Sequence, residues 1–126
     1  MLSSTLGVLA ARIGDRRQSL KLFEDGYASF QLEPFAMTDE YWSKKFPEMP
    51  RAGPFLANIG GFISSLLFGL PGIEMNSQAP TAWCRRPVVL PAGWRSIEVE
   101  RLWVRGEPHS LLAKHGAERT LLRAAP

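Results

Sequence analysis

Cysteine is almost absent from the chain, which has a single thiol at Cys84. One thiol cannot close a disulfide within the chain or complete a zinc site, so neither device can stabilise the fold. With 126 residues the chain can bury a core large enough to fold without them. The position of Cys84, between a tryptophan and an arginine, leaves a reactive thiolate open as an alternative, but a small buried apolar side chain is favoured.

Histidine is scarce too, with His109 and His115 six positions apart around a predicted turn. This spacing is poor for shared metal ligation, so we expect both side chains at the surface and neither a metal nor another cofactor. No serine lies in a G-x-S-x-G motif, so serine catalysis has little support. The pair Gly60 and Gly61 is not a phosphate-binding loop, because no lysine follows it, and it predicts close helix packing instead.

The excess of one charge sign is small. The chain has 15 Lys and Arg residues against 12 Asp and Glu, for a net charge of +3. Residues 1–83 contain seven basic and eight acidic groups, whereas residues 84–126 contain eight and four. The arginines of the second part are spread singly among predicted strand residues, which indicates a solvated sheet face. Nucleic acid is therefore not expected as a partner.

Long apolar runs are also few. Charged residues from Arg12 onwards leave no room for the apolar region of a signal peptide, and we expect a cytoplasmic protein. Residues 53–73 form a run of 21 without a charge, which by length alone could span a bilayer. The glycines, prolines and serines inside this run predict a helix buried among other helices, and no membrane partner is expected.

Apolar periodicity predicts two helices at the start of the chain, over residues 2–13 and 16–30. Gly14 ends the first helix and Asp15 can cap the second. So short a connection predicts an antiparallel helical hairpin. The apolar stripes are Leu2, Leu6, Leu9 and Ile13 in the first helix, and Leu20, Phe23, Tyr27 and Phe30 in the second.

A loop and a third helix follow the hairpin. Prolines at positions 34, 47 and 50 interrupt residues 31–53 and Pro54 follows them, and a loop of that length is usually functional. The third helix should run from Pro54 to about residue 67. It is apolar nearly all round, and a thirty-residue hairpin cannot enclose it. We therefore expect it to pack against a second copy of the chain or within a larger helical assembly.

The signals change to β structure after the polar connection at residues 75–80. Short apolar runs over residues 87–90, 96–104, 108–114 and 118–123 predict a small antiparallel meander. The alternation changes phase between Val99 and Leu102, which predicts a bulge near Arg101. The sequence thus predicts an α+β fold, with a helical part over residues 1–74 and a small antiparallel sheet over residues 75–126.

Two carboxylates stand beside two aromatic residues in the long loop. Asp39 and Glu40 precede Tyr41 and Trp42, and this combination suits carbohydrate, because rings stack on sugar faces while carboxylates bind hydroxyls. The alternative is that residues 38–40 only begin a short helical turn capped by Thr38. The residues alone leave both interpretations open.

Four segments, taken in order, resemble the C-terminal end of glycoside hydrolase family 65. This family contains trehalose, maltose and kojibiose phosphorylases and related inverting glucosidases. The resemblance extends from about Val8 to Leu122 and covers only the last part of a much longer enzyme. The segments are LAARIGDRRQSLKLFEDGYASF, EPFAMTDE, GPFLANIGGFISSLLFGLPGIEM and LPAGWRSIEVERLWVRGEPHSLLAKHGAERTLL.

The resemblance implies that the three helices close an (α/α)6 catalytic barrel and that the meander is the small β-sheet domain after it. It also implies cleavage of a glucose-containing disaccharide with inversion, by a general acid and either phosphate or a base-activated water. The acid lies upstream of the matched region. The base maps to Asp39 or Glu40, with a slight preference for Asp39, and Tyr41 and Trp42 would bind substrate.

Phosphorolysis and hydrolysis differ in what the resemblance requires near the site. Ser3 and Ser4, at the start of the first helix, match phosphate-binding serines by position. No histidine precedes His109, which favours hydrolysis. Because the acid is missing, we expect the chain alone to lack turnover and to need a partner carrying the upstream barrel. The alternative is a non-enzymatic interaction module that self-associates through the apolar helix over residues 54–70.

Overall fold

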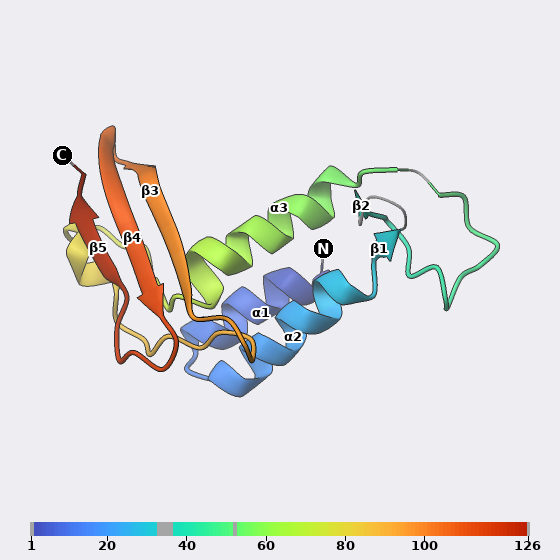
Figure 1. Cartoon of the computed structure of the whole chain (residues 1–126), viewed down its shortest axis with the longest axis horizontal. Helices are drawn as coiled ribbons and strands as arrows, with labels where there is room; N and C mark the ends of the chain where they lie inside the picture. Colours follow the sequence, from blue (N-terminus) through green and yellow to red (C-terminus); the bar gives the residue numbers. More distant parts are fainter. Residues whose placement is uncertain (1, 33–36, 52, 126) are drawn as a thin grey trace.

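The computed structural model describes residues 2–32, 37–51 and 53–125, and the structural statements below refer to them. Helices α1 (Leu2–Arg12), α2 (Arg16–Ala28) and α3 (Leu56–Ser64) lie side by side, and a three-stranded sheet stands beyond the end of α3 (Figure 1). A two-stranded ribbon, β1 (Gln31–Leu32) and β2 (Met37–Thr38), lies at the opposite end of the helices. The predicted α+β class is confirmed.

The helical hairpin of α1 and α2 is also confirmed. The Asp15 carboxylate caps α2 by accepting a hydrogen bond from the Gln18 amide at 2.9 Å. Gly14, with φ at +90°, makes the turn between the helices. The short connection and the Asp15 cap are thus both present where the sequence predicted them.

The apolar stripe of α1, however, faces outward. Leu6 and Leu9 are exposed and Ile13 is 82% exposed. The buried face instead consists of small residues such as Ser4, Gly7 and Ala11. A Cβ on Gly7 would lie 3.2 Å from the Ser19 carbonyl oxygen of α2. The two helices are so close that leucines cannot fit between them.

Helix α1 packs beside residues 65–69, which directly follow α3. The Ser65 hydroxyl donates to the Ser4 carbonyl at 3.4 Å, and a Cβ on Gly69 would meet Val8 at 3.5 Å. The first turns of α3 therefore extend past the level at which α1 begins. Leu56 is consequently 78% exposed.

The two ends of α3 differ from the prediction in detail. Phe55 is the N-cap residue, so Pro54 lies just outside the helix and not in its first turn. At the other end the chain widens into a π-helical segment, Ser65–Gly69. The Arg16 guanidinium caps this end by donating to the carbonyls of Gly69 and Leu70 at 2.7 and 2.6 Å. Burial, and secondarily the charge of Arg86, lower the pKa of Arg16 to about 10.

The sheet has the order β3 (Ser96–Val104), β4 (Glu107–Lys114) and β5 (Leu121–Ala124), with antiparallel neighbours. The register shifts between Val99 and Leu102, which confirms the bulge near Arg101. The predicted strand over residues 87–90 is wrong. This segment instead links helices and sheet, since the Val88 amide donates to the Ala117 carbonyl and the Val89 amide to the Leu70 carbonyl.

One apolar core joins the helical and sheet parts, so the predicted boundary at residue 74 lies inside it. The buried members of the core come from α2, from the end of α3, from the connection to the sheet and from all three strands: Phe23, Leu70, Ile73, Trp83, Cys84, Val88, Leu90, Val104, Leu111, Ala113 and Leu122.

Within the described residues, no helix is long and apolar enough to cross a membrane.

Two helical glycines give a matched test of this packing. A Cβ on Gly26 would lie 2.7 Å from the Ser4 hydroxyl, whereas a Cβ on Gly60 would meet nothing within 4 Å. Close packing at Gly60, which the sequence predicted, is therefore wrong. We expect Gly60→Ala to stabilise the chain by about 0.5–1 kcal/mol through helix propensity and Gly26→Ala to destabilise it by about 1–3 kcal/mol through overpacking. Urea unfolding measures both; equal effects of the two substitutions would contradict this packing.

Candidate functional site

The turn of Asp39 and Glu40 is held where β2 meets the start of α3. The Asp39 amide donates to the Phe30 carbonyl at 2.7 Å. The Asp39 carbonyl accepts from the Asn58 side-chain amide in the first turns of α3 at 2.5 Å, and the Thr38 carbonyl accepts from the Phe55 amide at 2.7 Å. Hydrogen bonds with Phe30, just after α2, and with the start of α3 thus fix the backbone of this turn.

The two carboxylates of the turn have different surroundings. Asp39 is 2% exposed, and its Oδ1 accepts a hydrogen bond from the Glu40 amide at 2.7 Å. Glu40 is exposed. Asp39 therefore orients the backbone at Glu40, while the Glu40 carboxylate can contact a ligand.

The alternative of a helical turn capped by Thr38 is wrong. Thr38 belongs to β2 and pairs with Gln31 of β1. Its hydroxyl is buried and has no hydrogen-bond partner among the described residues. The carboxylate pair therefore follows a strand and does not begin a helix.

Tyr41 and Trp42 continue the chain directly after the carboxylates. Tyr41 is half-buried and Trp42 is 40% exposed. The Trp42 carbonyl accepts from the amides of Lys45 and Phe46 at 2.9 and 3.0 Å, which makes a compact turn after the aromatic pair. This loop projects beyond the helices (Figure 1), and the exposed Trp42 side chain belongs to it.

The two serines proposed for phosphate take different positions. Ser4 is buried against α2, next to Gly26, and its carbonyl accepts from Ser65. Ser3 is half-buried. The start of α1 lies at the same end of the helices as β1 and β2 (Figure 1), so Ser3 shares this end of the molecule with the Asp39–Glu40 turn.

Sequence reasoning missed Asn58, which is buried in the first turns of α3. A lone asparagine inside a run of apolar residues and glycines is a signal, because a buried amide needs hydrogen-bond partners. Its partner, Asp39, lies 19 residues earlier in the chain. The sequence alone could have identified Asn58 as a candidate but not Asp39 as its hydrogen-bond partner.

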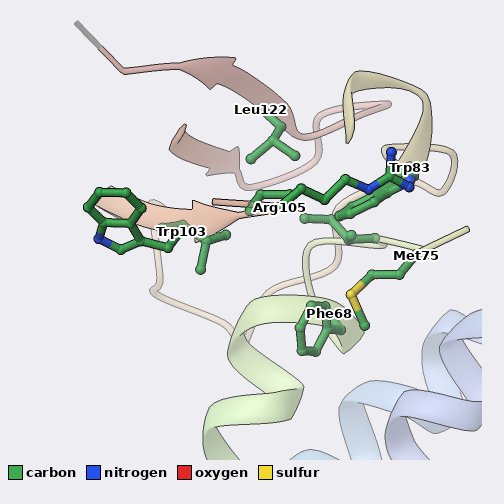
Figure 2. A pocket seen from close by; sticks show the side chains of 9 residues that line it. Phe68, Met75, Trp83, Trp103, Arg105 and Leu122 are labelled. Atoms are coloured by element: carbon green, nitrogen blue, oxygen red, sulfur yellow. The ribbon is translucent and has the colours of Figure 1, made fainter. Parts of the chain in front are cut away.

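A separate apolar pocket of about 250 Å³ opens between the end of α3 and the sheet. In Figure 2 the Arg105 side chain extends over Trp83, and the guanidinium carbon lies 5.1 Å from the ring centre. A second cavity of about 280 Å³, between α1 and α3, shares Phe68 and Met75 with it. Among the described residues that line the first pocket, Arg105 has the one charged side chain, so this pocket suits apolar contact and not catalysis.

Cys84 and the histidines take no part in the Asp39–Glu40 turn. Cys84 is buried, as predicted, and burial raises the pKa of its thiol. His115 is exposed, whereas His109 is half-buried with Nδ1 at 3.1 Å from the Glu107 carbonyl. The thiol therefore fits a packing role.

Comparison of the chain with protein-family models, with curated proteins and with solved structures finds no match in any of the three. A functional proposal therefore depends on the residues and their geometry.

The Asn58 contact gives a direct test of the turn. We expect Asn58→Ala to destabilise the chain by about 1–3 kcal/mol, because the buried Asp39 carbonyl loses a donor. The amides of Phe55 and Glu40 should also exchange faster, since both donate hydrogen bonds within this turn. Urea unfolding and amide hydrogen exchange measure the two effects. Asn76→Ala, near the sheet, is the control and should leave the exchange of Phe55 and Glu40 unchanged; the same exchange in both variants would contradict the role of Asn58.

Proposed function

We propose that this chain forms the closing helices and sheet domain of a larger carbohydrate-active enzyme, similar to the inverting α-glucosidases and disaccharide phosphorylases of glycoside hydrolase family 65. The substrate class is a glucose-containing disaccharide, and the chain alone does not turn it over. The observation that carries the proposal is the uncovered apolar surface of α3, next to a turn that presents a carboxylate.

Two apolar stripes support a larger helical assembly. On α3, Leu56, Gly60 and Ile63 recur at spacings of four and three, and all three are exposed. On α1 the outward stripe is Leu6, Leu9 and Ile13. Each leucine or isoleucine would gain about 1.5–3 kcal/mol on burial. Further helices packed on both stripes, as in a helical barrel, would supply that burial.

The turn supports Glu40 as the base. An inverting hydrolase needs a carboxylate that reaches a water near the sugar, with the acid roughly 6.5–9.5 Å away. Glu40 is exposed, whereas the Asp39 carboxylate faces inward and accepts the Glu40 amide. These contacts favour Glu40 as the base. The sequence resemblance had slightly favoured Asp39 for this role. Asp39 would then position the base, and Tyr41 and Trp42 would contact the sugar.

Reconstitution tests this proposal. The chain is mixed with the polypeptide that carries the upstream helices, and glucose release from trehalose, maltose and kojibiose is assayed with and without phosphate. We expect mixing to produce activity that neither piece has, and Glu40→Gln to lower kcat by about 10²- to 10⁴-fold because base catalysis is lost. Glu48→Gln, in the same loop and exposed, is the control and should retain the rate. No gain on mixing would contradict the proposal.

The second candidate is the interaction module that self-associates through α3. It is favoured by Gly60, where open space between Leu56 and Ile63 would admit a neighbouring helix. The first candidate leaves this face uncovered in the isolated chain, so we expect the chain to bind a dye for apolar surface and Leu56→Asp with Ile63→Asp to reduce that binding.

Sedimentation at micromolar concentration separates the two candidates. We expect a monomer when the upstream piece is absent. A stable dimer that the double substitution dissociates would support the interaction module instead. A monomer without dye binding would contradict both.

A further inference from the structure

Two apolar hollows adjoin where the end of α3, helix α1 and the sheet come together. The first has a volume of about 250 Å³ and the second about 280 Å³, and they share Phe68 and Met75. Figure 2 shows Met75 between Phe68 on one side and Arg105 with Trp83 on the other. Together the two hollows reach the size of typical ligand sites, which neither reaches alone. We call the surface from Arg105 past Met75 and Phe68 to Arg12 the groove.

The lining of the groove is apolar and open to solvent. Met75 is 53% exposed, and Trp103 at the sheet side is 66% exposed. Few of the described lining side chains can form hydrogen bonds, and the Trp83 indole already donates to the carbonyls of Asn76 and Gln78 at 3.1 and 3.2 Å. An extended peptide would bring N–H and C=O groups that find few partners here, whereas an aliphatic chain brings none. The lining therefore favours an aliphatic chain.

The charged side chains of the groove have one sign. Among its described lining residues Arg105 lies at one end and Arg12 at the other, and none is acidic. Glu74 precedes Met75 in the sequence, but its carboxylate accepts a hydrogen bond from Arg86 at 2.7 Å. Neither Arg105 nor Arg12 forms an ion pair with a described residue. The groove therefore attracts an anion and repels a cation.

Arg105 is held in a fixed position at its end of the groove. With Gly106 it forms the two-residue turn between β3 and β4, and its φ of +53° is uncommon for a residue other than glycine. Its guanidinium carbon lies 5.1 Å from the centre of the Trp83 ring, and Nη2 donates to the Asn76 carbonyl at 2.7 Å. A guanidinium has five N–H groups and Arg105 is exposed, so further donors can bind a ligand carboxylate.

We propose that the groove binds a fatty acid, with its carboxylate on Arg105 and its aliphatic chain passing Met75 and Phe68 toward α1. The arginines select an anionic head group, and the apolar lining selects the chain. The proposal does not depend on the proposed function. It concerns the chain alone, in which Leu9 is exposed on the α1 stripe and lines the second hollow.

Titration of the whole chain with decanoate tests the site. The four tryptophans make the measurement selective, since each indole N–H gives its own NMR signal. Trp83 and Trp103 line the groove, whereas Trp42 lies in the loop after β2 and Trp94 in the segment before β3. We expect saturable shifts of the Trp83 and Trp103 signals, with a Kd of about 1 mM.

Two related probes separate the head group from the chain. Octanoate is shorter by two methylene groups, and we expect it to bind about tenfold more weakly because less apolar surface is buried. Decylammonium has a chain of the same length but a positive head group, and it should also bind at least about tenfold more weakly. This comparison of head groups needs no variant of the protein.

Variants at Arg105 test the head-group contact. Arg105→Asn removes the charge, while asparagine tolerates the left-handed backbone. We expect it to weaken decanoate binding about tenfold and to abolish the preference over decylammonium. Arg105→Lys keeps the charge and should retain most of the binding. Arg119→Gln, at an exposed arginine outside the groove, is the control and should match the unchanged chain. The remaining signals show whether each variant is folded.

Other results would overturn the proposal. Equal binding of decanoate and decylammonium would show that the groove does not select an anion. Decanoate binding that Arg105→Asn leaves unchanged would overturn Arg105 as the carboxylate site. Shifts of all four indoles without saturation, or no shift at Trp83 and Trp103, would show that the groove is not a site. Shifts of these two signals with protein concentration alone would show that a second copy of the chain occupies it instead.

Discussion

Packing around the Phe23 ring is the interaction on which the arrangement of helices, sheet and candidate site depends. This ring touches those of Tyr27, Phe62 and Trp94, and so connects α2, α3 and the segment that leads into β3. The same three rings line a cavity of about 170 Å³, and Asn58 lies one helical turn before Phe62 on α3. The position of the Asp39–Glu40 turn therefore follows from the positions that the ring contacts impose on the two helices.

The sequence predicted those parts of the fold that depend on neighbouring residues. The hairpin followed from the cap at Asp15, and the bulge followed from the change of alternation near Arg101. The orientation of α1 could not be predicted, because it depends on how closely α1 approaches α2 at Gly7 and Gly26. Helical periodicity shows that a stripe exists, but it does not show whether this chain covers it. The extended segment over residues 87–90 resembled a strand because Val88 and Leu90 are buried, although its hydrogen bonds go to separate elements.

The sequence could identify the two residues of the candidate site but not the different role of each. Asp39 and Glu40 are adjacent in the sequence, and nothing in their order shows that one faces inward and the other outward. That difference arises from contacts with Phe30 and Asn58, which lie nine residues before and 19 after Asp39. The cavity lined by these rings was missed for the same reason. Tyr27 and Phe62 each fit an apolar helix stripe, and only the tertiary arrangement places them opposite Gln31 and Thr38.

The π-helical stretch Ser65–Gly69 sets the rotational phase between the two halves of the third helix. A π-helical turn amounts to one additional residue within an α-helix. Phe62, before it, must face Phe23, while Leu70, after it, must face the core shared with the sheet. Each residue turns an α-helix by about 100°, so the loss of one residue here would point one half away from its contacts. The loop after Trp42 can vary in length at little cost, whereas this stretch has a fixed length.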